Sequence, residues 1–542
     1  LVDKSMLQAS PGSYRMHDML RQYGAEKLAA AEQFARPVRD AHSVYYLERL
    51  ARCEVRLKSA QRSATLREMD AEINDLQAAW KGACLQVNIS LLQGSLSGMC
   101  LYYEMRVRYN EGEQACQLAL SALPVVHEQE SGVAVLHARL LLWRANFLVL
   151  SGDLDAARAL RQQASELLNR LEAQGVDTRR PRAMYWQSEG EDQADLRLKL
   201  ECYQRGIALY QDLGDPWRQA GMLVWAGEYG MRLGNPELAL ASQQEALRLA
   251  RQLGEPGLLL HCLRQSTSLF LMLNQLDTAH PLMQEAIAVC EGVEEPSLRA
   301  NAQMHLGQHL NLCGRFIEAI QILEQSVPVL RSLGYRYGTV YGTLALGFAY
   351  YMNGDYARGE AIQKIGFSEA EQGNFWREAA VILGALAMTS LALGQPQKAI
   401  EYSCEVVARY RRMQFAGELA MALGALAHAQ TATGQLAAAR DSLREALPLA
   451  EKTRNMAAMY LDLPAIVHLL VRTGGLELAL ITHRLALRVP MLGHSRWYAD
   501  VIGNEMEGHW NALSPEQQAA LDVTVQGHTP FSIIPEVLAQ LV

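Results

Sequence analysis

The sequence of 542 residues predicts an all-α protein built as a solenoid of about ten helical hairpins. The strongest observation is a repeat with a period of 40 residues, in which one turn position is filled by Gly234, Asn274, Gly314, Gly354, Gly394, Gly434 and Gly474. Small residues recur at fixed distances from this turn. Between them, apolar residues follow helical spacing, as in ELALASQQEALRLARQL.

Small residues mark further positions of each repeat. Five residues after the turn stand Ala239, Ala279, Ala319, Gly359, Ala399, Ala439 and Ala479. Gly or Asn at the turn can adopt φ > 0 and end one helix, and small residues allow neighbouring helices to approach closely. The pattern therefore predicts stacked antiparallel helix pairs. With turns near Asn110, Gly152 and Ala194 included, the predicted array covers residues 89–494.

The order of the small positions resembles the tetratricopeptide repeat, with longer helices than in the common unit. This resemblance implies a right-handed superhelix whose first helices line a groove for a protein, a peptide or a small-molecule inducer. It also implies nine groove-facing residues: Arg264, Asn301, Gln308, Asn311, Tyr341, Phe348, Tyr351, Met388 and His428. Aromatic side chains there would offer stacking area and a polar tip. The alternative is that most of the tyrosines in the Tyr-rich unit YRYGTVYGTLALGFAYYMNGDY pack between helices.

Residues 1–35 do not follow the repeat. LVDKSMLQ and YRMH read as two strands joined by the turn ASPGS, and Asp18 stands at the N-cap of a following helix. This segment resembles the end of the winged-helix domain in the NB-ARC class of signal-transduction ATPases, the STAND family. The resemblance implies that Met16, His17 and Asp18 form the family's Met-His-Asp motif, whose His contacts the β-phosphate of ADP and holds the inactive state.

The regions on either side of the array fit the same resemblance. Residues 36–88 resemble the linker helices that join the ATPase core to the repeats, through Glu72, Asn74, Leu76 and Trp80. Residues 495–542 resemble final helices that cap the solenoid. The chain starts with Leu and has no GxxxxGK[ST] loop to hold phosphates, so we expect a fragment of a longer polypeptide. We therefore expect no cofactor in these residues, and ADP or ATP in the parent protein.

The composition and the absence of several motifs exclude some classes of function. The net charge of −8 argues against direct nucleic-acid binding, and the absence of CxxC pairs and of a signal peptide indicates a cytoplasmic location. The uncharged runs 337–354, 379–397 and 419–439 recur at one phase of the repeat, which membrane spans have no reason to do. HLGQH lacks the Glu and the third ligand of a zinc site, and no GxSxG is present, so we assign no metal site and no catalytic residue.

These observations predict a non-enzymatic, signal-sensing and protein-interaction region. Its groove would bind an inducer or partner and couple it to an upstream ATPase domain in cis, with oligomerisation possible on activation. A plain scaffold without nucleotide control is the main alternative. Two further alternatives are a DNA-binding winged helix and a small-molecule binding module that acts alone.

Overall fold

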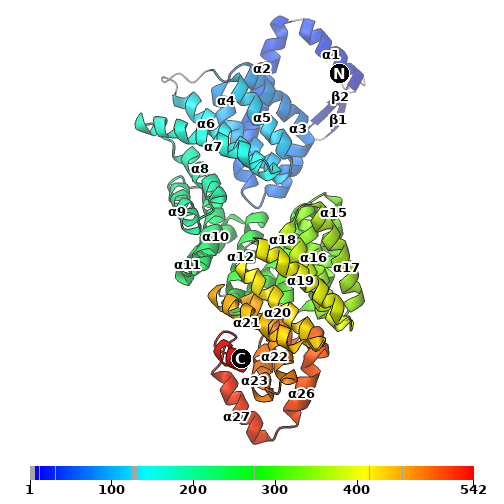
Figure 1. Ribbon diagram of the computed structural model, residues 1–542. Helices are drawn as coiled ribbons and strands as arrows, with labels where there is room; N and C mark the ends of the chain where they lie inside the picture. The colour runs from blue at the N-terminus through cyan, green and yellow to red at the C-terminus, as the bar shows by residue number, and fades with distance from the viewer. Residues whose placement is uncertain are drawn as a thin grey trace. The chain divides into compact units, whose positions relative to one another are not determined.

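The computed structural model describes residues 7–10, 13–16, 18–30, 32–124, 131–273, 275–413, 415–453 and 456–541. These residues form a series of helices that follows a two-stranded hairpin (Figure 1). The chain divides into two compact units, unit 1 at Leu1–Cys262 and unit 2 at Leu263–Val542. The division falls inside one helix of the predicted array, so each unit is described by itself.

Unit 1 begins with the predicted hairpin and helix. Strand β1 (Leu7–Ser10) pairs antiparallel with β2 (Ser13–Met16), and Leu7 lies opposite Met16. Helix α1 (Asp18–Ala30) follows, so Asp18 is its first residue. His17, the central residue of the Met-His-Asp motif, lies outside the described residues.

The rest of unit 1 is helical, and its helices alternate in direction as hairpins. A core cluster joins residues of α2 and α3 to residues of α4, α5 and α6. The bounds are α2 (Glu32–Leu57), α3 (Arg62–Leu85), α4 (Ile89–Met105), α5 (Tyr109–Ala122), α6 (Ser131–Ser151), α7 (Leu154–Ala173), α8 (Arg179–Asp192), α9 (Leu196–Asp212), α10 (Pro216–Arg232) and α11 (Pro236–Leu253). The next helix, α12 (Pro256–Met272), begins in unit 1 and ends in unit 2.

Unit 2 continues the array and ends in short helices. Its array helices are α13 (Leu276–Gly292), α14 (Pro296–Leu312), α15 (Phe316–Ser332), α16 (Arg336–Met352), α17 (Tyr356–Gln372), α18 (Trp376–Ala392), α19 (Pro396–Met413), α20 (Ala416–Ala432), α21 (Leu436–Thr453), α22 (Met456–Arg472) and α23 (Leu476–Leu487). The final elements are α24 (Pro490–Gly493), α25 (Arg496–Tyr498), the π-helix η1 (Ala499–Gly503), α26 (Asn504–Asn511), α27 (Pro515–Gln526) and α28 (Ile534–Gln540).

The all-α array of helical hairpins is confirmed, and nine pairs of successive helices between α4 and α23 contact each other as hairpins among the described residues. The predicted turn glycines adopt left-handed backbone, with φ from 69° at Gly394 to 93° at Gly152. A second series, which was not predicted from the sequence, lies halfway between them at Gly214, Gly254, Gly334 and Asn374, again with φ > 0. This conformation costs other residues about 1–2 kcal/mol, and the two series together end successive helices every 20 residues.

Helix α6 is the one helix of the described residues that is long and apolar enough to cross a membrane. Its most apolar window is 61% buried inside the structure. Leu136, Leu140 and Phe147 of this helix are fully enclosed in the core of unit 1. The packing of α6 in the core of unit 1 therefore explains why this helix is so apolar.

Candidate functional site: the first-helix face of unit 2

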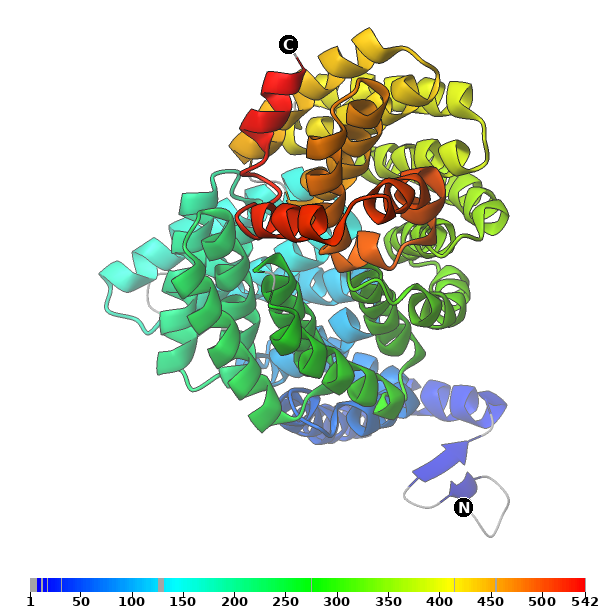
Figure 2. The same cartoon turned by 90° about the horizontal axis from the view of Figure 1, so that it is seen from below.

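The first helices of five successive hairpins in unit 2 share one face, and the chain's own residues 490–503 lie across it. We call α14, α16, α18, α20 and α22 the first helices, and residues 490–503 the C-terminal segment. Helix α24 contacts α14, α25 contacts α16, and η1 contacts α18 and α22. Figure 2 shows these orange-to-red elements against the green-to-yellow hairpins.

Trp497 anchors the C-terminal segment on this face. Its side chain is 1% exposed, and its indole N–H donates a 2.9 Å hydrogen bond to the backbone carbonyl of Met388 in α18. The ring packs edge-on against Tyr351 in α16, with centroids 6.1 Å apart, and against His428 in α20, at 5.8 Å. One side chain therefore joins three successive hairpins.

Two turn glycines let the C-terminal segment pass close to the array. A Cβ atom at Gly314 would lie 2.5 Å from the carbonyl oxygen of Pro490, and one at Gly354 would lie 2.6 Å from Cγ of Arg496. At Gly394, where φ is similar to that at Gly314, nothing lies within 4 Å. The C-terminal segment therefore packs closely against these two turns as well as through Trp497, because only glycine leaves room for it at both positions.

The C-terminal segment covers three of the predicted groove residues, and a fourth lies beside one of them. Tyr351, Met388 and His428 are 2%, 3% and 1% exposed, and Phe348 is partly buried beside Tyr351. We expected these side chains to face an open groove. They instead form the surface on which residues 490–503 pack, because the predicted capping region folds back onto the first helices.

Three other predicted residues, Arg264, Gln308 and Tyr341, lie at or beside an open aromatic patch, which we define as His305, Tyr337, Tyr341 and Phe375. The Tyr341 hydroxyl donates to Gln308, and Tyr337 stacks on Tyr341 with ring centroids 5.9 Å apart. Tyr337 also meets Phe375 edge-on at 5.8 Å, and His305 lies 5.6 Å from Tyr341. Burial raises the pKa of Tyr341 to about 12, and the nearby charge of Arg264 partly offsets this rise. The patch is a half-exposed surface for an aromatic or apolar group.

The two predicted asparagines differ in role. Asn311 is buried and donates a 2.8 Å hydrogen bond to the backbone carbonyl of Ala345 in the next hairpin. It therefore joins two hairpins, and its amide group is not presented to a ligand. Asn301 is half-buried in α14.

Buried titratable groups lie beneath the C-terminal segment. His428 and His468 have ring centroids 5.1 Å apart, and burial lowers the pKa of His468 to about 4. Burial, followed by the nearby His468, lowers the pKa of His428 well below its ordinary value. Both rings are therefore neutral near pH 7, and the face is apolar around the anchor.

Asp462 in α22 predicts a pH dependence of stability. Its carboxyl group is fully buried without a hydrogen-bond partner among the described residues, and burial raises its pKa well above 3.8. The folded state thus binds this proton more tightly than the unfolded state, so stability falls as the pH rises above about 4. Each tenfold difference in proton affinity between the two states corresponds to about 1.4 kcal/mol. Asp462→Asn should therefore remove this loss of stability at pH 7.

The measurement for this prediction is urea unfolding at pH 4.5 and pH 7.5. We expect Asp462→Asn to be more stable than the wild type at pH 7.5, with a smaller difference at pH 4.5. Asp441→Asn, on an exposed position of α21, is the matched control and should change neither value. An Asp462→Asn protein with the same stability difference at both pH values would contradict the prediction.

Trp497 was not among the site residues predicted from the sequence. It stands outside the 40-residue repeat, in the region predicted only to cap the array. Its position as the sole Trp of the segment HSRWYAD, beside a turn-rich stretch, is a weak signal that could have been used. Its partners on α16, α18 and α20 follow from tertiary packing.

The Met-His-Asp motif lies far from this face along the chain. The Met16 side chain is 36% exposed at the end of β2, and Asp18 begins α1. His17 lies outside the described residues, so the contact that the family resemblance implies stays a prediction.

Comparisons with known proteins support the fold. No family model matches the chain, and no curated protein matches its sequence. Among solved structures, the Rap protein complexed with competence and sporulation factor is 12% identical with a TM-score of 0.50, covering 66% of this chain and 98% of that one. A STAND protein with a tetratricopeptide repeat sensor from Pyrococcus horikoshii is 13% identical with a TM-score of 0.38, and the match covers 76% of this chain and 57% of that one. At 12% identity the likeness to the Rap protein shows the fold alone, an array of helical hairpins of the tetratricopeptide type.

Proposed function

We propose that the chain is the sensing and protein-interaction region of a nucleotide-switched regulator of the STAND class. Its first-helix face in unit 2 would bind a partner protein, a peptide or a small-molecule inducer. The observation that carries the proposal is the C-terminal segment itself. A face on which a stretch of 14 residues packs around one buried Trp anchor has the chemistry to bind polypeptide.

The arrangement suggests how such a signal would act. A partner that competes for the Trp497 site would release residues 490–503, and the open aromatic patch beside it offers a first contact. A signal shifts an equilibrium only when it binds two states with different affinity. Here the two states would be the first-helix face with residues 490–503 packed on it and the same face with them released. The Rap protein of the comparison is complexed with competence and sporulation factor, which is in keeping with this use of the fold.

Nucleotide control is the finer part of the proposal and rests on the family resemblance. Met16, His17 and Asp18 would contact ADP held by a domain upstream of Leu1. The chain itself would contribute no catalytic residue, and its sites would act in the cytoplasm. A plain scaffold for protein–protein interactions, with the same face and no nucleotide control, is the second candidate.

One experiment separates the two candidates. In a polypeptide extended at its N-terminus, amide hydrogen exchange of residues 490–503 is measured with ADP and with a non-hydrolysable ATP analogue. Coupling predicts that exchange in this segment differs between the two nucleotides. Equal exchange, or no binding of ADP to the extended protein, would leave the plain scaffold as the function.

A further inference from the structure

Unit 1 contains a narrow pocket on its own first helices, α6, α8 and α10. Trp143, Gln187, Ser188, Glu191 and Arg218 are among the residues that line it. The cavity measures about 20 Å³, within a hollow of about 310 Å³ that includes open solvent. The floor therefore has room for one group of the size of water or ammonium, and the rest of a ligand would extend outward.

Buried polar atoms surround this pocket without hydrogen-bond partners among the described residues. The indole N–H of Trp143 is one, although that side chain is only 3% exposed, and the hydroxyl of Ser188 is another, at 8%. Oε2 of Glu104, in the preceding first helix α4, is also buried without such a partner; Glu104 does not line the pocket, but its charge acts on both Glu191 and Arg218. Native interiors pair nearly all such atoms, so a polar species bound at this pocket would satisfy the Trp143 N–H and the Ser188 hydroxyl.

Arg218 supplies a positive charge at the same place. Its guanidinium group lies over two aromatic rings, 5.2 Å from the centroid of Trp143 and 5.0 Å from that of Trp217. Within the described part of the chain, no carboxylate forms an ion pair with it. A guanidinium that is stacked on aromatic rings and forms no ion pair among the described residues is suited to receive a carboxylate.

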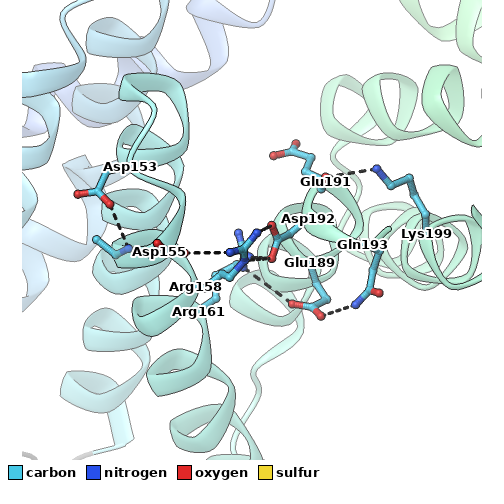
Figure 3. Close-up of polar contacts among 10 residues, drawn as sticks. Asp153, Asp155, Arg158, Arg161, Glu189, Glu191, Asp192, Gln193 and Lys199 are labelled. Atoms are coloured by element: carbon cyan, nitrogen blue, oxygen red, sulfur yellow. Dashed lines mark hydrogen bonds and ion pairs between the residues drawn. The ribbon is translucent and has the colours of Figure 1, made fainter. Parts of the chain in front are cut away.

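Glu191 and Glu104 supply negative charge. Figure 3 shows the Glu191 carboxylate turned away from the network in which Arg158 and Arg161 bind Asp192. A 3.4 Å hydrogen bond from Gln187 reaches it from one turn earlier in α8. Desolvation raises the pKa of Glu191, the charge of Glu104 raises it further, and Arg218 lowers it. The two acids and the arginine thus act on one another electrostatically, yet the acids form no ion pair with Arg218 among the described residues.

We propose that this pocket binds a small zwitterion, with its ammonium group beside Glu191, where Glu104 adds negative charge, and its carboxylate on Arg218 and the Trp143 N–H. A ligand with only a negative charge would meet two carboxylates, and one with only a positive charge would meet Arg218. A molecule that carries both charges a few atoms apart satisfies all of them. Amino acids are the simplest members of this class. The site is separate from the first-helix face of unit 2 and does not depend on the function proposed for that face.

Isothermal titration of the full chain with a graded set of probes tests the proposal. Glycine, β-alanine and γ-aminobutyrate vary the distance between the two charges, while acetate and methylammonium each carry only one. We expect at least one zwitterion to bind with a Kd below about 1 mM, and both single-charge probes to bind at least tenfold more weakly. No binding by any zwitterion at about 1 mM would show that the pocket holds only water. Equal binding of acetate would also overturn the assignment.

Variants locate the binding site. Glu191→Gln and Arg218→Gln should each weaken zwitterion binding at least tenfold, and Trp143→Phe, which keeps the ring and removes the N–H, should weaken it less. Glu245→Gln and Arg248→Gln, an exposed pair on α11, are the matched controls and should bind as the wild type does. Because part of Glu191 reaches solvent, its variant should keep the fold even if Arg218→Gln does not. Wild-type binding by Glu191→Gln would contradict the proposed site.

Discussion

Replacing Trp497 by Ala should lower the free energy of unfolding of unit 2 by about 3–5 kcal/mol, as for other buried Trp side chains. The side chain is 1% exposed and contacts Tyr351, Met388 and His428 on three hairpins. Its loss leaves a cavity and also leaves the C-terminal segment without its anchor. Urea unfolding followed by circular dichroism measures the change, with the two units fitted as separate transitions.

Trp376→Ala is the matched control for this prediction. Trp376 lies in the same unit, at the start of α18, and is 50% exposed. Its truncation should change stability by less than about 0.5 kcal/mol. If both tryptophan variants lose the same small amount, Trp497 is not packed as the structure places it.

Replacing Glu255 by Ala should destabilise unit 1 by about 3–5 kcal/mol, because it breaks a buried ion pair. Glu255 is 0% exposed at the N-terminus of α12, and one of its oxygens accepts a 2.9 Å hydrogen bond from Arg62 at the start of α3. Its other oxygen accepts from the indole N–H of Trp217 at 3.0 Å and from the backbone N–H of Leu258 at 2.8 Å. One carboxylate therefore joins residues 193 positions apart in the sequence.

The comparison that checks this prediction is with an exposed ion pair in the same unit. Glu245 pairs with Arg248 on α11, where both side chains are largely exposed. Glu245→Ala should lower the free energy of unfolding of unit 1 by at most about 1 kcal/mol, because ion pairs on the surface contribute little to stability. A loss at Glu255 no larger than the loss at Glu245 would mean that the Arg62 contact is not buried in solution.

Much of the fold could be predicted because each hairpin carries its own local signals. Turn glycines such as Gly314 and Gly354 end helices through backbone conformation alone, and small residues such as Ala399 and Ala439 set the packing of neighbours. The second series of turns escaped notice because its members vary more, with Asn at 374 and Glu near 294. The sequence therefore predicts the 40-residue hairpin unit, and only the turn between one hairpin and the next had no predicted position.

The candidate site could be predicted only in part, because it depends on contacts between distant segments. The repeat assigned Tyr351, Met388 and His428 to the first helices, where they lie. No local pattern indicates that Trp497, more than 100 residues beyond Met388, would cover them. The same holds for unit 1, where Glu104, Glu191 and Arg218 come from three hairpins and share no sequence motif.

The central claim is that the first-helix face of unit 2 binds polypeptide, with the C-terminal segment as its present occupant. The most direct measurement is the affinity of a fluorescent synthetic peptide of residues 490–503 for the Trp497→Ala chain. In the wild type the tethered segment competes at a high effective concentration, so the peptide should not bind. The variant's own segment lacks the anchor, so the peptide should bind it at least tenfold more tightly than it binds the wild type or Trp376→Ala. A peptide that binds neither the wild type nor Trp497→Ala, or one that binds equally well with its own Trp replaced by Ala, would contradict the claim.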